Sequence, residues 1–344
     1  MGSWIECSGV KSLGSSILVD EWVVAIGTGS SQYPQIRIAR EMGYKVLGVD
    51  RRVDSSPVDY LINVSTHDSS SVLREVEEFV LPGHPVSGVI TRTSGPPVGT
   101  AKILADSLSV PSYGARVAGS SISKESLFLN AIELGLPTID TSFEHVEHAF
   151  DYPVVVKPAE PLIGKKNVFF LESSQNLGEA LFRAGQESVN GRAIVQRYWE
   201  GRDLGVFLLC VEGEIVWSFL YEENVELVDG KFTGLGVSWP VRDVAVGTLS
   251  NAIEISSKFL DGDRHNGFVC LSFRLTPSGK LLLYEVNPGL GGDQIASKLM
   301  PSVFPGFDPA LLEFHALLAL GFTGSELLSL NEQCGTPTTV VVRG

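Results

Sequence analysis

The first third of the chain alternates short apolar runs with segments in which apolar residues recur at helical spacing. An apolar run at 23–26 ends in a glycine-rich turn, and Ile36, Ala39 and Met42 then follow at intervals typical of one helix face. The predicted strands are 23–26, 45–49 and 86–91, and the predicted helices are 34–42, 73–80 and 98–108. Because strands separated by helices pair in parallel, we predict an α/β domain whose parallel sheet carries helices on both faces.

The pattern changes beyond residue 152, where strand-like runs follow one another with few helices between them. A helix is predicted at 122–134, where Gly135 and Pro137 end it, and another at 244–260. The predicted strands of this part are 154–157, 167–171, 193–198, 205–211, 214–221, 268–275 and 280–286. Runs of strands with a few helices predict an α+β architecture for the second half.

The composition is that of a globular protein with an excess of acidic residues. Of the 344 residues, 44% are apolar and 19% are charged, and the net charge at pH 7 is −14. A field of that sign repels nucleic-acid backbones and anionic lipids, so we expect no nucleic-acid partner and no membrane partner. The apolar stretch 309–322 is short and is interrupted by Glu313 and His315, which predicts an amphipathic helix.

The cysteines and the first residues predict a cytoplasmic protein. The four cysteines are scattered without CxxC spacing, which favours reduced thiols over a zinc site or a disulfide framework. They are Cys7, Cys210, Cys270 and Cys334. Residues 1–11 lack the basic start and the apolar stretch of a secretory signal.

The turn after the first strand partly matches a dinucleotide-binding fingerprint. Gly27 and Gly29 flank Thr28, and Asp50 ends the next strand, where nicotinamide-binding domains place an acidic residue on the ribose. The third glycine of the fingerprint is missing, because Gln32 occupies its position. A tight turn or a contact to a small ligand is therefore favoured over NAD binding.

Two lysines and one loop are candidates for binding an anion. Lys157 ends the apolar run PVVVKP, and a charge at the end of a buried strand needs an anionic partner. Lys124 lies at a predicted helix start, where the helix dipole disfavours a cation. The loop between the next two strand runs adds groups that can close over phosphates, namely Gly164, Lys165 and Lys166. The competing interpretation is a set of solvated lysines and a polar hairpin tip.

The segment YEVNPGLGGD contains a candidate metal site at the end of a predicted strand. Strand alternation places Glu285 and Asn287 on one face, while Tyr284 and Val286 face the other. A carboxylate and an amide oxygen are hard ligands that suit magnesium carrying the phosphates of a nucleotide. The glycines that follow allow a substrate to approach the backbone closely. The competing interpretation is a strand end followed by a turn.

In chain order, these motifs resemble the ATP-grasp superfamily of carboxylate–amine ligases. The series comprises a lysine before a helix, PVVVKP, a loop, AIVQRYWEGRDLGV and a hairpin ending in YEVNPGLGGD. The earlier segments GYKVLGVDRR and VITRTSGPPVGTAKILADSLSVPS resemble the domain that precedes ATP-grasp in biotin carboxylase-like, purine-biosynthetic and amino-acid ligases. The resemblance implies an N-terminal α/β domain at 1–112, a linker helix and small subdomain with a phosphate lid at 113–192, and a C-terminal subdomain with the metal site at 193–344.

The same resemblance implies a site for ATP and Mg²⁺. The implied nucleotide-binding residues are Lys124 and Lys157 at the phosphates, Gly164 and Lys165 in the lid, Gln196, Arg197 and Trp199 at the adenine, Asp203 at the ribose, and Asn287 beside the metal. Glu285 and Asn287 are implied to hold magnesium. The residues implied to contact the substrate are Gly289, Gly291 and Asp293.

The chemistry that the resemblance implies is phosphorylation of a carboxylate by ATP, followed by attack of an amine on the acyl phosphate. We therefore expect a small carboxylate and an amine as partners, amino acids among them, and a homodimer is compatible with this resemblance.

Three departures from the family pattern bear on this activity, one of which is that the lid contains few glycines. Ser272 stands where a second metal carboxylate is usual, and Gly289 stands where an arginine is usual. Arg274 shares a strand face with Ser272, and with Lys157 it is the candidate for catalysis. The departures favour the alternative hypothesis of a degenerate ATP-grasp protein that binds nucleotide or ligand without turnover.

Overall fold

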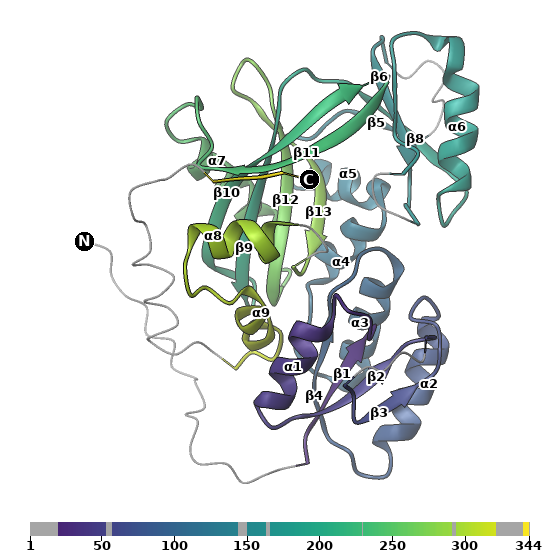
Figure 1. The fold of residues 1–344 in the computed structure, drawn as a ribbon. Coiled ribbons are helices and arrows are strands. Elements are labelled where there is room, and N and C mark those ends of the chain that lie inside the picture. Colours follow the sequence, from purple (N-terminus) through teal and green to yellow (C-terminus); the bar gives the residue numbers. More distant parts are fainter. Residues whose placement is uncertain are drawn as a thin grey trace.

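The computed structural model describes residues 20–52, 57–143, 150–162, 166–228, 230–290, 294–320 and 340–343. Its strands form a four-stranded N-terminal sheet, a four-stranded small sheet and a six-stranded large sheet. In Figure 1 the N-terminal sheet lies below the large sheet, and the small sheet lies above and to the right. None of the helices within these ranges has the length and apolar character needed to span a bilayer.

The N-terminal sheet is parallel throughout, in the order β3-β2-β1-β4. Its elements are β1 (Trp22–Ile26), α1 (Tyr33–Glu41), β2 (Lys45–Val49), β3 (Tyr60–Ile62), α2 (Ser69–Val80), β4 (Val86–Thr91) and α3 (Pro96–Leu108). All five residues of β1 are buried, as expected for a central strand covered by helices on both faces. The predicted parallel α/β architecture is therefore confirmed. The short edge strand β3 was missed because its apolar run is only three residues long.

Two helices connect the N-terminal sheet to the rest of the chain, namely α4 (Ala115–Ile122) and α5 (Lys124–Glu133). The helix predicted at 122–134 begins only at Lys124, because the Ser123 hydroxyl accepts a hydrogen bond from the Ser126 amide at 3.3 Å and caps it. The small and polar residues of α4 gave no helical pattern, so that helix was not predicted.

The small sheet is antiparallel, in the order β5-β8-β6-β7. Its strands are β5 (Thr141–Ser142), β6 (Val154–Pro158), β7 (Phe169–Leu171) and β8 (Ala193–Arg197). The helix α6 (Leu177–Gln186) covers it by burying Leu177, Ala180 and Ala184 in a core shared with Val154 and Val156.

The large sheet has the order β13-β12-β9-β10-β11-β14. Its strands are β9 (Arg202–Val211), β10 (Glu214–Val228), β11 (Lys231–Trp239), β12 (Gly267–Leu275), β13 (Leu281–Pro288) and β14 (Val340–Arg343). The predicted strand 214–221 continues for seven further residues, and β11 was missed because two glycines interrupt its apolar pattern. The two strands form a long hairpin that reaches toward the small sheet (Figure 1).

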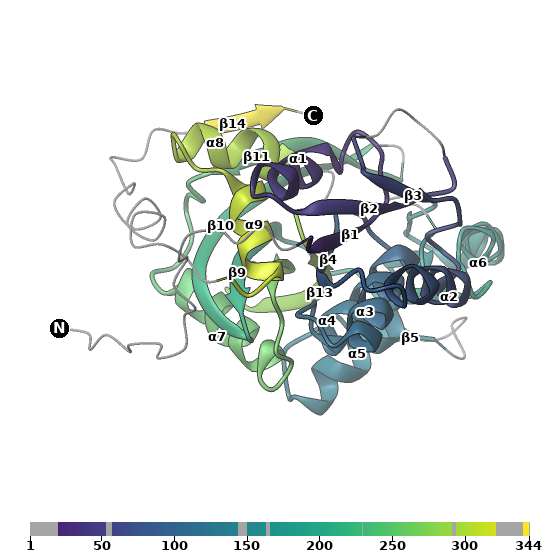
Figure 2. The same cartoon turned by 90° about the horizontal axis from the view of Figure 1, so that it is seen from below.

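Helices cover both faces of the large sheet. On one face, α7 (Thr248–Leu260) buries Phe259 against Leu271 and Phe273. The other face carries η3 (Ile295–Leu299), α8 (Met300–Val303) and α9 (Pro309–Leu317). This second core continues into the N-terminal sheet, because α9 and α1 lie side by side (Figure 2) and share one cluster of buried residues.

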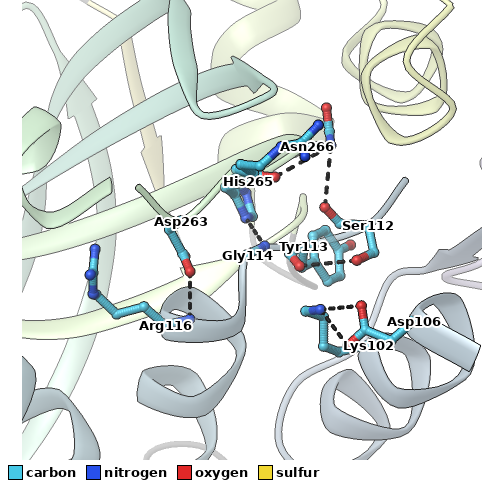
Figure 3. Close-up of polar contacts among 10 residues, drawn as sticks. Lys102, Asp106, Ser112, Tyr113, Gly114, Arg116, Asp263, His265 and Asn266 are labelled. Atoms are coloured by element: carbon cyan, nitrogen blue, oxygen red, sulfur yellow. Dashed lines mark hydrogen bonds and ion pairs between the residues drawn. The ribbon is translucent and has the colours of Figure 1, made fainter. Parts of the chain in front are cut away.

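A polar junction joins the start of α4 to the turn before β12 (Figure 3). The Asp263 carboxylate accepts hydrogen bonds from the amides of Arg116 at 2.7 Å and Val117 at 3.0 Å, which caps α4 from 146 residues away. The Gly114 amide donates to Nδ1 of His265 at 3.0 Å. Gly114 has no space for a side chain, since a Cβ there would lie 2.0 Å from an Asp263 oxygen.

Candidate nucleotide site

A cleft lies between the small sheet and the large sheet. It brings together most of the residues predicted for the nucleotide site, namely Lys124, Lys157, Gln196, Arg197, Trp199, Asp203, Arg274 and Glu285. Asn287 and Gly289 do not line it. The remaining predicted site residues, Gly164, Lys165, Gly291 and Asp293, lie outside the described residues.

Lys124 is the first residue of α5 and is nevertheless only 8% exposed. Its Nζ donates to Oε1 of Glu285 at 2.7 Å, and its backbone amide donates to the Ala159 carbonyl at 2.9 Å. The ion pair offsets both the burial of the ammonium group and the unfavourable end of the helix dipole. It also connects the linker helix to the edge strand of the large sheet.

Lys157 projects from β6 into the same cleft, with its Nζ 5.8 Å from the centre of the Tyr284 ring. Burial lowers the pKa of its ammonium group to about 7, and the nearby charge of Lys124 adds to this effect. The carboxylates of Glu285 and Asp203 act in the opposite direction. Near neutral pH this lysine is therefore poised between its charged and neutral forms, and a bound anion would favour the charged form.

Arg274 and Asp203 form a second ion pair on neighbouring strands, β12 and β9. Their nearest atoms, Nη2 and Oδ1, are 3.1 Å apart, and both side chains are largely buried. The guanidinium also donates to the Gly201 carbonyl at 3.1 Å and lies 5.8 Å from the centre of the Tyr198 ring. These contacts fix the orientation of Arg274 along one wall of the cleft.

Ser272 lies directly opposite Glu285 in the pairing of β12 with β13 and is 2% exposed. The pairing register shifts after Ser272, so that Phe273 faces Leu283 and Tyr284 is an extra residue on β13. The prediction that Tyr284 faces away from Glu285 is therefore wrong, because the bulge brings both side chains into the cleft.

Another part of the cleft is formed around β8. The Gln196 side chain donates from Nε2 to the Thr141 hydroxyl at 2.8 Å, and that hydroxyl donates to the Ile139 carbonyl. The Arg197 guanidinium lies 5.8 Å from the centre of the Trp199 ring. Nε1 of Trp199 is buried and finds no hydrogen-bond acceptor among the residues that the structure describes.

The long β10–β11 hairpin contributes cleft residues that the sequence analysis missed, namely Glu223, Val225, Phe232 and Gly234. The ring of Phe232 packs near those of Phe170 and Tyr198, with centroid distances of 6.2 and 6.5 Å. The available signal was the alternation of residues after Tyr221, which continues the strand past its predicted end. Flat apolar walls of this kind suit a planar aromatic ring.

The partial dinucleotide fingerprint lines a separate pocket at the carboxyl edge of the N-terminal sheet. Gln32 lies across the turn, and a Cβ on Gly27 would come within 3.3 Å of its amide. Gln32 donates to the Arg92 carbonyl at 2.8 Å, and Asp50 accepts from the Thr28 amide at 2.9 Å. The side chains that would have to meet a dinucleotide are thus engaged in holding the turn, which agrees with the preference against NAD.

The residues present fit a magnesium ion only if the ion takes further ligands from a bound nucleotide. Glu285 and Asn287 supply a carboxylate and an amide oxygen from one strand, the oxygen chemistry that Mg²⁺ prefers. Ser272 offers no second carboxylate. No group of three or more histidine, cysteine, aspartate or glutamate side chains in the described ranges is arranged to hold a metal.

Comparison of the sequence with models of known families and with curated proteins finds no match. The fold, however, is similar to several solved structures. L-amino acid ligase from Bacillus licheniformis superposes with a TM-score of 0.71 at 17% identity, over 90% of this chain and 77% of that one. N5-carboxyaminoimidazole synthetase from Staphylococcus aureus, complexed with ADP, has a TM-score of 0.69 at 15% identity, over 88% and 78%.

Biotin carboxylase from Campylobacter jejuni, in a β,γ-ATP complex, has a TM-score of 0.66 at 16% identity, over 90% of this chain and 73% of that one. These likenesses extend over 88–90% of this chain. They confirm the predicted fold class, in which a parallel α/β sheet precedes an ATP-grasp fold.

Proposed function

We propose that this chain is an ATP-dependent ligase that activates a small carboxylate and joins it to an amine. The main observation behind this proposal is that one cleft between two sheets is lined by Lys124, Lys157, Arg274 and Glu285. The cleft is lined by more basic than acidic side chains, which suits the phosphates of a nucleotide together with a metal ion. The fold neighbours that are ligases of this kind support the same reaction class.

In the proposed reaction, an oxygen of the substrate carboxylate attacks the γ-phosphorus of ATP, the bond to the bridging oxygen breaks, and ADP leaves. The amine then attacks the acyl carbon, and phosphate leaves as the amine loses its proton. Lys157 and Arg274 neutralise charge on the transferring group, as phosphoryl transfer requires. Lys124 holds the phosphates, and its ion pair with Glu285 rearranges when the nucleotide enters.

The adenine is assigned to the end of the cleft around Gln196, Arg197 and Trp199, and the ribose to Asp203. Glu285 and Asn287 would hold Mg²⁺, which supplies additional positive charge at the phosphates when bound. We also retain 1–112, 113–192 and 193–344 as the proposed functional units, with the phosphate lid at 161–168.

The test is a screen for ADP release with Mg-ATP, purified protein and pairs of amino acids or other small carboxylates with amines. Release that requires both a carboxylate and an amine, and that disappears in a Lys157→Met variant, is the expected result. Absence of substrate-dependent release across the screen, with nucleotide binding intact, supports the alternative of a protein that binds nucleotide without turnover. Ser272 and Gly289 are the residues that favour that alternative.

A further inference from the structure

A buried pair of acidic groups lies away from the nucleotide cleft, where the N-terminal sheet meets the large sheet. Glu313 on α9 is fully buried, and its Oε1 lies 3.3 Å from the hydroxyl of Tyr113, which is 4% exposed. The Tyr113 hydroxyl also lies 3.0 Å from the carbonyl oxygen of Thr91, the last residue of β4. Neither group has a role in the proposed reaction.

The two contacts of the Tyr113 hydroxyl determine where the protons reside. A phenol has one hydrogen, and the carbonyl of Thr91 can only accept it. If Tyr113 donates to Thr91, its contact with Glu313 is a hydrogen bond only when the carboxyl group is protonated and donates to the phenol oxygen. Burial favours that form and raises the pKa of Glu313 to about 8.

The other oxygen of Glu313 connects the pair to the strand end that carries the candidate metal ligands. Oε2 accepts a hydrogen bond from the amide of Phe268, and the carbonyl of Phe268 accepts one from the amide of Gly289 at 2.7 Å. Gly289 lies two residues after Asn287, immediately past the end of β13 at Pro288. One buried residue thus connects the end of β4 with the turn that follows the candidate metal ligand.

Two glycines allow the backbone to close around this pair. Gly267 has φ +97°, and a Cβ there would lie 3.1 Å from both oxygens of Glu313. Gly289 has φ +73°, and a Cβ there would lie 2.8 Å from the Tyr113 hydroxyl. The space beside Gly289 is therefore filled by Tyr113, which explains why no larger side chain occupies this position.

We propose that Tyr113 and Glu313 are positioning residues. While the Glu313 carboxyl group is protonated, the hydrogen bonds of this pair hold the turn at Gly289 in place relative to the end of β4. Ionisation of Glu313 draws the phenol hydrogen toward the carboxylate, and the hydrogen bond to Thr91 is then lost. The hydrogen-bonded connection between the N-terminal sheet and the large sheet therefore weakens as the pH rises. Its effect on magnesium binding at Asn287 rests on the proposed function. The hydrogen-bonded connection itself is a property of the ligand-free protein.

Several other ionisable groups lie around Glu313. Tyr113 has a pKa raised well above its usual value by burial and by the charge of Glu313. His265, stacked on Tyr113 at 5.5 Å, has its pKa lowered to about 4 by burial and is neutral. The other nearby ionisable groups are Arg92 after β4, which favours the carboxylate, Cys210 on β9, whose pKa is raised, and His315 on α9.

The test measures amide hydrogen exchange at Gly289 in the full chain without ligands, from pH 6.5 to 9.5, corrected for intrinsic exchange rates. The protonated fraction of Glu313 falls from about 0.9 at pH 7 to about 0.1 at pH 9, so protection in the wild type should fall by roughly tenfold. Glu313→Gln keeps an acceptor for Phe268 and a donor for Tyr113, so its protection should stay high and independent of pH. Tyr113→Phe should lower protection at every pH, and the exposed Glu254→Gln should behave like the wild type.

The proposal is overturned if Glu313→Gln fails to fold or loses protection at pH 6.5, because the neutral amide would then not replace the carboxyl group. It is also overturned if the pH response of Gly289 persists in Glu313→Gln. Failure of the ligase screen leaves both outcomes unaffected, since no nucleotide is present in this experiment.

Discussion

Lys157 should take up a proton when a nucleotide binds. Its pKa is about 7 in the ligand-free cleft, because it is buried beside Lys124, whereas an adjacent polyphosphate restores the preference for the charged ammonium. At pH 8 about one lysine in ten is charged before binding, so binding should take up about 0.9 proton. Phosphate groups are fully ionised at this pH, since their second pKa is about 6, and should not contribute.

The linkage also sets the size of the pH effect on affinity. Binding requires the charged lysine, and the charged fraction falls from about 0.5 at pH 7 to about 0.01 at pH 9, so the affinity for ATP should fall by roughly 50-fold. The stability of the ligand-free protein changes with pH in the opposite direction to the affinity for ATP. The unfolded chain holds more protons than the native state between pH 7 and 10.5, so this lysine makes the protein more stable as the pH rises through that range.

Calorimetric titration with ATP in two buffers of different ionisation enthalpy measures the proton uptake directly. Lys157→Met keeps the apolar stem and should abolish the uptake at pH 8, while its melting temperature at pH 6 should exceed that of the wild type. Lys166, an exposed lysine of the same cleft paired with Glu187 at 2.7 Å, provides the matched control, because Lys166→Met should leave the uptake unchanged. Equal uptake in the wild type and Lys157→Met, or none in either, would refute the assignment.

Three further predictions concern the two ion pairs and the residue opposite Glu285. Ser272→Asp should lower the melting temperature without metal and tighten Mg²⁺ binding in the presence of ATP, because it places a second carboxylate across from Glu285; a lower melting temperature with unchanged Mg²⁺ affinity contradicts this. Glu285→Gln should abolish ADP release while ATP still binds, since Lys124 is freed for the phosphates, and residual turnover measured by coupled assay contradicts it. Arg274→Met should destabilise the protein by about 3–5 kcal/mol, because Asp203 is left as a buried charge, and adding Asp203→Asn should recover part of that loss in denaturant unfolding; no recovery in the double variant argues against the pair.

Much of the fold was predictable because its signals are local. Apolar runs such as the one at Trp22–Ile26 and the spacing of Ile36 and Ala39 report burial directly, and the alternation of strands and helices indicates a parallel sheet. The missed helix α4 depends on a cap supplied by Asp263, which no local pattern contains. The missed strand β11 owes its conformation to pairing with β10 rather than to its own glycine-containing sequence.

The residues proposed for the site were named from the sequence, but their contacts with one another were not. The sequence placed Lys124 and Glu285 in one site without indicating that they touch, because their contact spans 161 residues. The side that Tyr284 faces was predicted incorrectly, since strand alternation assumes unbroken pairing and the bulge opposite Ser272 breaks it. Glu313 was read as an interruption in an amphipathic helix, and only its contacts with Tyr113 and Phe268 reveal a buried acid.

The capping of α4 by Asp263 determines how this chain can be divided. During synthesis, residues 115–122 leave the ribosome well before Asp263, which accepts hydrogen bonds from two of their amides. The start of the helix therefore stays uncapped until the turn before β12 has been made. A fragment that stops after the small sheet also lacks His265, the acceptor for Gly114. Expression of the first 200 residues alone should therefore yield a segment with a frayed junction. Separation of the chain into independent halves would require a new capping residue at position 114, where the loss of Asp263 also removes the atoms that crowd a Cβ.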